Sequence, residues 1–126
     1  MALFDTDVLV WYLRGNRRAA RAIDAAEERF ISVITYMELL QGARNRKEVR
    51  EIKHTLLDFG FAVLPLTENI SNRAVVYMEE YGLKVAMGYG DALIAATAVE
   101  HSLVLITGNR KHYSPVRELR VRQFRP

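Results

Sequence analysis

The sequence predicts an α/β fold, a three-layer α/β/α sandwich with a mostly parallel central sheet. Short apolar, strand-like segments alternate with longer segments of helical periodicity along the 126 residues. Parallel strands need a crossover between them, and the crossover is usually a helix. Half of the residues are hydrophobic, so a chain of this length can bury a core without disulfides. We therefore expect one domain that spans residues 1–126.

Five short segments have the composition of β-strands. The third is interrupted late by Pro65. The fourth is apolar up to its last residue, which is typical of a strand buried on both faces of a parallel sheet. The fifth alternates apolar side chains with Arg120 and Arg122, which is typical of an edge strand. In chain order the predicted strands span residues 3–4, 30–33, 61–66, 103–107 and 119–124.

Six longer segments have the periodicity of α-helices. In the fourth, Val49, Ile52 and Leu56 form an apolar stripe, and Gly60 follows as a stop signal. The sixth is rich in alanine, which favours close packing against its neighbours. In chain order the predicted helices span residues 6–13, 17–28, 35–43, 47–59, 68–81 and 91–101.

Three acidic residues, Asp5, Glu38 and Asp91, stand where apolar segments pass into helices. Because ligand sites in parallel sheets form beyond the carboxyl ends of the strands, we expect these three and Asn109 to reach one edge of the sheet. Carboxylates beside apolar segments are costly to desolvate, and three together would repel one another. A divalent cation such as Mg²⁺, which takes oxygen ligands, would resolve that conflict.

Each acid also has a local explanation. Asp5 and Asp91 are suited to capping the helices that follow them. Thr35 and Glu38 have the three-residue spacing of a capping box. Asp7 is a first-turn acid that the helix dipole favours. Capping and metal ligation do not exclude each other, so both interpretations stay open for each residue.

Composition excludes several other kinds of site. The chain has no cysteine, and its three histidines show no metal-ligand spacing. No apolar segment reaches the roughly 20 residues of a membrane span, and no secretory signal is recognisable, so we expect a cytoplasmic protein. The net charge is +3, and most of the 18 basic residues are arginine. This composition indicates an anionic partner, although a solvated basic surface explains it equally well.

Four segments together resemble a PIN-domain ribonuclease, and most closely the VapC-type toxins of prokaryotic toxin–antitoxin pairs. The similarity covers nearly the whole chain, with the motifs in the family's order and at its usual length. The chain departs from the family pattern in two respects: Asp7 replaces an asparagine, and Asn109 and His112 occupy the stretch that often holds a fourth acid. The segments are Asp5-Thr6-Asp7-Val8-Leu9, Glu38-Leu39-Leu40, Asp91-Ala92-Leu93-Ile94-Ala95 and Thr107-Gly108-Asn109-Arg110-Lys111-His112-Tyr113.

The resemblance implies metal-dependent hydrolysis of RNA. Asp5, Glu38 and Asp91 would then hold one or two Mg²⁺ or Mn²⁺ ions, which would activate a water and neutralise the phosphate oxygens. It also implies a homodimer and a cognate antitoxin, a segment of which lies over the acidic groove. The family's two threonines correspond to Thr6 and Thr107. Candidate residues also include Asn109 near the metal and, for contact with the RNA backbone, Arg110, Lys111, Arg17 and Arg18.

Two other functions fit parts of the sequence. Asp5-Thr6-Asp7-Val8 resembles the first motif of haloacid-dehalogenase-type phosphatases, in which the first Asp is a nucleophile; the order of later motifs and the unused Glu38 oppose this. A receiver domain fits the length, but Asp58 lies within a predicted helix rather than at a strand end. A PIN-like module that binds RNA or a protein partner without cleavage is the third possibility, since the fourth acid is missing.

Overall fold

A computed structural model describes residues 1–126 and has a single five-stranded sheet at its centre. All four strand pairs are parallel, and the strand order is β3-β2-β1-β4-β5. The predicted fold class is therefore confirmed, and the last strand lies at an edge as its alternating pattern indicated. The strands are β1 (Ala2–Phe4), β2 (Arg29–Ser32), β3 (Ala62–Leu64), β4 (Val104–Thr107) and β5 (Val121–Gln123).

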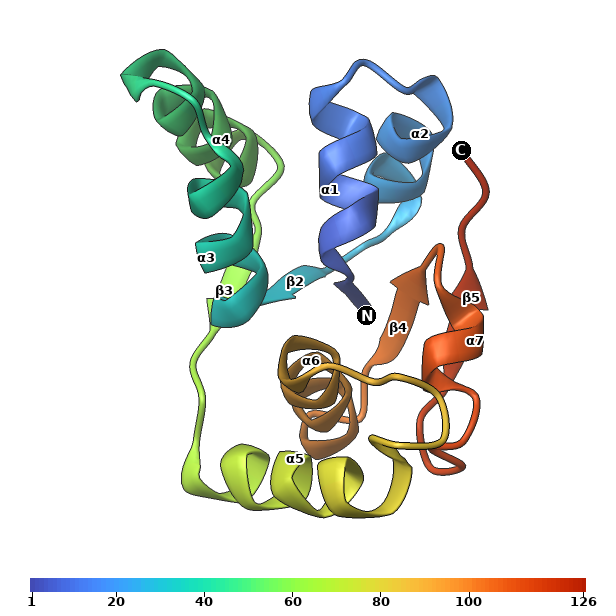
Figure 1. The fold of residues 1–126 in the computed structure, drawn as a ribbon. Helices are drawn as coiled ribbons and strands as arrows, with labels where there is room; N and C mark the ends of the chain where they lie inside the picture. The colour runs from blue at the N-terminus through green and yellow to red at the C-terminus, as the bar shows by residue number, and fades with distance from the viewer.

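Helices cover both faces of this sheet (Figure 1). Helices α1 to α4 lie on one side, and α5 to α7 lie on the other. None of these helices has both the length and the hydropathy needed to span a membrane. Their bounds are α1 (Thr6–Leu13), α2 (Arg17–Ala25), α3 (Val33–Gly42), α4 (Arg46–Asp58), α5 (Glu68–Tyr81), α6 (Tyr89–Glu100) and α7 (Arg110–Tyr113).

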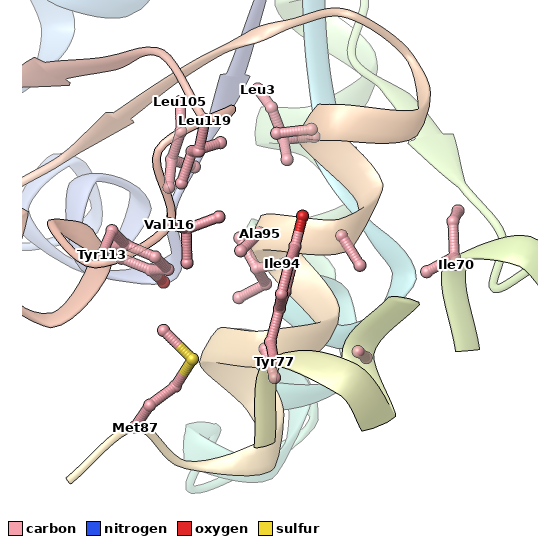
Figure 2. Close-up of a cluster of buried hydrophobic side chains, with 14 of the residues drawn as sticks. Leu3, Ile70, Tyr77, Met87, Ile94, Ala95, Leu105, Tyr113, Val116 and Leu119 are labelled. Atoms are coloured by element: carbon pink, nitrogen blue, oxygen red, sulfur yellow. The ribbon is translucent and has the colours of Figure 1, made fainter. Parts of the chain in front are cut away.

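The strands divide the core into two clusters because successive side chains of a strand point to opposite faces. Phe4 and Ile106 face the cluster formed with α1 to α4. Leu3 and Leu105 face the cluster formed with α5 and α6, which Figure 2 shows in close-up. The alanine-rich α6 lies against the sheet in this second cluster, and its small side chains permit close contact with α5. Both faces of the central strands are therefore buried.

Several element boundaries differ from the prediction. Helix α2 ends at Ala25 rather than at residue 28, because the Arg29 guanidinium donates to the carbonyls of Ile23 and Asp24 at its carboxyl end. Helix α3 begins two residues earlier than predicted, with Ser32 as its N-cap. The capping box at residues 35 and 38 was therefore wrong. Helix α6 likewise begins earlier, at residue 89, and the four-residue α7 was not predicted.

The register of the two central strands brings the start of α1 beside the end of β4. Phe4 pairs with Ile106, and the next amide along, that of Asp5, donates to the Ile106 carbonyl at 2.9 Å. Asp5 therefore lies next to Thr107 across the ladder, although about a hundred residues separate them in sequence. This junction is the starting point of the candidate site.

Candidate active site

Asp5 is the most buried of the predicted acids, with 5% of its surface exposed. One carboxylate oxygen accepts from the Thr6 amide at 2.8 Å, so Asp5 does cap α1. The other oxygen accepts from the hydroxyls of Thr107 at 2.7 Å and Tyr113 at 3.0 Å. Burial, followed by the charge of Asp7, raises the pKa of Asp5 to about 6, and its hydrogen bonds only partly oppose this shift.

Asp91 lies in the first turn of α6 and is joined to Asp5 through Tyr113. The Tyr113 hydroxyl is 3.3 Å from Asp91 Oδ1 and 3.0 Å from Asp5 Oδ2. The capping role that the sequence left open for Asp91 is not observed, because Gly88 is the N-cap of α6 and no side chain caps it. The other oxygen of Asp91 lies 3.6 Å from Nδ1 of His112, longer than a hydrogen bond.

Glu38 approaches the site from α3 and is joined to α1 through Thr6. The Thr6 hydroxyl donates to Glu38 Oε1 at 2.6 Å and lies 3.0 Å from the Thr35 hydroxyl. Glu38 is otherwise exposed. Its second oxygen, Oε2, lies close to Gly90 of α6: a Cβ built on Gly90 would be 3.5 Å from this oxygen. Thr6 thus touches Glu38 by its side chain and Asp5 by its amide.

Asp7, whose role the sequence left open, links α1 to the turn after β4 by a hydrogen bond, called here the Asp7–Gly108 bond. Its Oδ2 accepts from the Gly108 amide at 2.8 Å. Its Oδ1 is buried and has no hydrogen-bond partner. Burial raises the pKa of Asp7, because desolvation penalises the charged form. An unpaired carboxylate oxygen in such a place is unfavourable unless a further donor or a cation reaches it.

Substitution of Gly108 by alanine is expected to break the Asp7–Gly108 bond. A Cβ at Gly108 would lie 2.5 Å from Asp7 Oδ2, so the carboxylate would be displaced from the Gly108 amide. We expect a loss of about 1–3 kcal/mol in the free energy of unfolding, measured by urea denaturation. Gly42→Ala is the matched control, because a Cβ there meets nothing within 4 Å at the end of α3. Equal unfolding free energies of Gly108→Ala and Gly42→Ala would show that the Asp7–Gly108 bond does not stabilise the fold.

A groove of about 360 Å³ opens over these carboxylates. Arg14 lines it, at the end of α1, with its guanidinium 5.7 Å from the centre of the Trp11 ring. Thr107 is fully buried, so it acts by orienting Asp5 rather than by touching a ligand in the groove. The groove is lined by Asp5, Thr6, Asp7, Val10, Trp11, Arg14, Asp91 and Asn109.

The four basic residues predicted to contact RNA lie outside this lining. Arg110 and Lys111 are exposed on α7, directly after the groove residue Asn109. Arg17 and Arg18 are exposed at the start of α2, and Arg17 lines a different hollow beside Tyr12 and Glu51. Their contact with RNA stays a prediction.

The carboxylates offer an oxygen donor set that fits a hard divalent cation. Asp5, Asp7 and Glu38 form no ion pair with any lysine, arginine or histidine, and Asp91 has only the longer contact with His112. No three acidic or histidine side chains converge around one point in this structure; the Tyr113 hydroxyl lies between Asp5 and Asp91, and the Thr6 hydroxyl contacts Glu38. The buried, unpaired oxygen of Asp7 and the raised pKa of Asp5 are both what a bound cation would relieve.

Sequence reasoning missed two contributors to the site. Tyr113 lies in the last of the four motifs without a predicted role, yet its hydroxyl contacts both Asp5 and Asp91. The available signal was weak: a buried tyrosine needs a partner for its hydroxyl. Arg14 was not considered, although it follows Asp7 by seven residues and therefore lies on the same face of α1 two turns later.

Comparisons with known proteins agree with this architecture. The PIN domain family matches residues 2–117. The chain is 38% identical over 124 residues to a protein named Ribonuclease VapC10 from Mycobacterium tuberculosis, covering 95% of this chain and 91% of that one. A toxin–antitoxin complex from Klebsiella pneumoniae contains a similar chain, with 32% identity, a TM-score of 0.79 and coverage of 94% and 95%. FitAcB from Neisseria gonorrhoeae gives 27% identity, a TM-score of 0.75 and coverage of 96% of each chain. The chain therefore belongs to the PIN domain family and, within it, to the VapC-type proteins.

Proposed function

We propose that this chain is a divalent-metal-dependent ribonuclease that acts as the toxin of a type II toxin–antitoxin pair. The observation that carries the proposal is that Asp5 and Asp91, from distant segments, line one groove, and that Glu38 is joined to the same junction through the Thr6 hydroxyl. The similarity to Ribonuclease VapC10 and to a chain of a toxin–antitoxin complex supports it.

In this proposal Asp5, Glu38 and Asp91 are the metal ligands, and Mg²⁺ or Mn²⁺ are the candidate ions. A cation bound there would lower the pKa of a coordinated water and neutralise the phosphate oxygens. Thr107 and the Thr6 amide hold Asp5 in place, and the Thr6 hydroxyl does the same for Glu38. Asn109, at the rim of the groove, offers an amide to the phosphate or to a water. Arg14 offers a positive charge to the RNA backbone.

The position of Glu38 weighs against a haloacid-dehalogenase-type phosphatase. The phosphatase reaction needs Asp5 as a nucleophile and has no role for Glu38. The chain's membership of the PIN domain family favours the nuclease as well.

A second groove beside the site could bind a segment of a protein partner. This groove of about 470 Å³ runs between α1, α3 and α4, and Val10 and Arg14 line both it and the carboxylate groove. Glu38 also lines this second groove, so a segment bound there would lie next to the metal ligands. This arrangement supports an antitoxin that covers the site. The homodimer that the resemblance implies stays a prediction.

RNA cleavage by the purified protein should require Mn²⁺ or Mg²⁺. We expect excess chelator to stop cleavage and added Mn²⁺ to restore it, because no side chain can replace the cation as activator of water. Gel analysis of a labelled RNA follows the reaction, and an inactive variant purified in parallel excludes a contaminating nuclease. RNA binding without cleavage would favour the non-catalytic module. Hydrolysis of a small phosphoester through a trapped phospho-aspartate would favour the phosphatase.

A further inference from the structure

The Tyr113 hydroxyl is held at a fixed point between two of the proposed metal ligands. The ring belongs to the core cluster of Figure 2, where it packs with Val116 and Ala95, and the residue is 1% exposed. Tyr113 is the last residue of the one-turn helix α7, which begins shortly after the carboxyl end of β4. Because the ring is enclosed, the hydroxyl cannot swing away from Asp5 and Asp91, at 3.0 and 3.3 Å.

Asp91 depends on this hydroxyl more than Asp5 does. Asp5 also accepts from Thr107 and from the Thr6 amide, so two donors fix its orientation independently of Tyr113. The Tyr113 hydroxyl has one proton to share between the two carboxylates, and it is the only donor within hydrogen-bonding distance of Asp91, which does not cap its own helix. Without it, the Asp91 side chain would be free to change rotamer in the groove.

We infer that Tyr113 is a positioning residue that sets the separation and orientation of Asp5 and Asp91 for a shared divalent cation; this rests on the proposed metal-dependent function. The hydroxyl contacts both carboxylates from a buried residue that does not line the groove shared by Asp5 and Asp91. It therefore limits their spread without occupying the position of the cation or of the RNA. Such outer partners of metal ligands typically affect metal affinity or activity by about 10- to 100-fold.

The substitution Tyr113→Phe removes the hydroxyl and keeps the ring. The chain offers a matched control, Tyr77→Phe, because Tyr77 belongs to the same core cluster and its hydroxyl also donates to a carboxylate, that of Glu118, away from the groove. Tyr77→Phe loses one hydroxyl–carboxylate contact and Tyr113→Phe loses two, so both should lose some stability. Only Tyr113→Phe should lose metal affinity.

Isothermal titration with Mn²⁺ alone, on the full chain without RNA, measures this affinity independently of activity. We expect the Mn²⁺ dissociation constant to rise about tenfold or more in Tyr113→Phe and to stay at the wild-type value in Tyr77→Phe. In parallel cleavage assays, raising the Mn²⁺ concentration should restore most of the cleavage rate of Tyr113→Phe, because Asp5, Glu38 and Asp91 remain.

An unchanged Mn²⁺ affinity in Tyr113→Phe would overturn the inference while leaving the proposed function in place. An equal loss in both variants would also overturn it, since the cause would then be general destabilisation of the core. So would a failure of Tyr113→Phe to fold, because the hydroxyl would then serve folding rather than metal geometry. Absence of both Mn²⁺ binding and RNA cleavage in the wild type would instead refute the proposed function, and the inference with it.

Discussion

Asp5→Asn is expected to abolish metal-dependent RNA cleavage while the chain stays folded. The substitution removes the charge that would bind the cation and keeps an oxygen that can accept from Thr6 or Thr107. Changes to the partners of metal ligands alone cost about 10- to 100-fold, so the loss of a ligand's charge should exceed about 100-fold. Initial rates on a labelled RNA at saturating Mn²⁺ measure the effect, and circular dichroism checks the fold.

Asp24→Asn is a suitable control for this substitution. Asp24 is exposed on α2, and its contact with Arg29 is long, at 4.0 Å. The same chemical change there should leave the cleavage rate within experimental error of wild type. Substantial cleavage by a folded Asp5→Asn protein would remove Asp5 from the metal ligands and with it the central part of the proposed mechanism.

The stability of the protein in chelator should fall as the pH rises from about 4 to about 6. Burial and the charge of Asp7 raise the pKa of Asp5 from 3.8 to about 6. The folded state therefore holds the Asp5 proton more tightly than the unfolded state. The stabilisation from this proton is complete below the unfolded pKa and is lost as the pH passes the folded pKa. It amounts to about 3 kcal/mol, since one pKa unit corresponds to about 1.4 kcal/mol.

Urea denaturation of wild type and Asp5→Asn between pH 4 and pH 7 isolates this contribution. Groups distant from Asp5 titrate alike in both proteins, so the difference in their unfolding free energies reports the Asp5 proton together with its coupling to Asp7. We expect that difference to change by about 3 kcal/mol across the range, with wild type losing stability relative to the variant. Added Mn²⁺ should stabilise wild type mainly above pH 6, because metal ligands bind in their deprotonated form. A difference that is constant with pH would show that the Asp5 pKa is not raised.

The sequence alone was a good guide to the fold because its signals are local. Apolar segments of strand length and stripes at helical spacing predicted five strands and six of the helices, and strands separated by helices implied a parallel sheet. The boundaries were less well predicted. The end of α2 depends on the Arg29 guanidinium, and the start of α3 depends on which of two polar residues, Ser32 or Thr35, becomes the N-cap. Those choices follow from contacts made after the chain has folded.

The acids of the site were also identifiable from sequence, because each carboxylate stands beside apolar residues near the predicted start of a helix, where its desolvation is costly. The hydrogen bonds of the site were not. The Tyr113–Asp5 and Gly108–Asp7 bonds each join residues about a hundred positions apart. No local pattern encodes them, since they result from the parallel register of β1 and β4 and from the packing of α7 against the core.

The sequence by itself thus determined the fold class, the PIN-type motif order and the positions of the three proposed metal ligands. Only the tertiary structure decided how those ligands are held: Thr6 beside Glu38, Tyr113 between Asp5 and Asp91, and Asp7 against Gly108. The physical reason is that periodicity and strand-end chemistry act within a few residues. The separation and charge of the carboxylates depend instead on which distant groups the packed core brings within hydrogen-bonding distance.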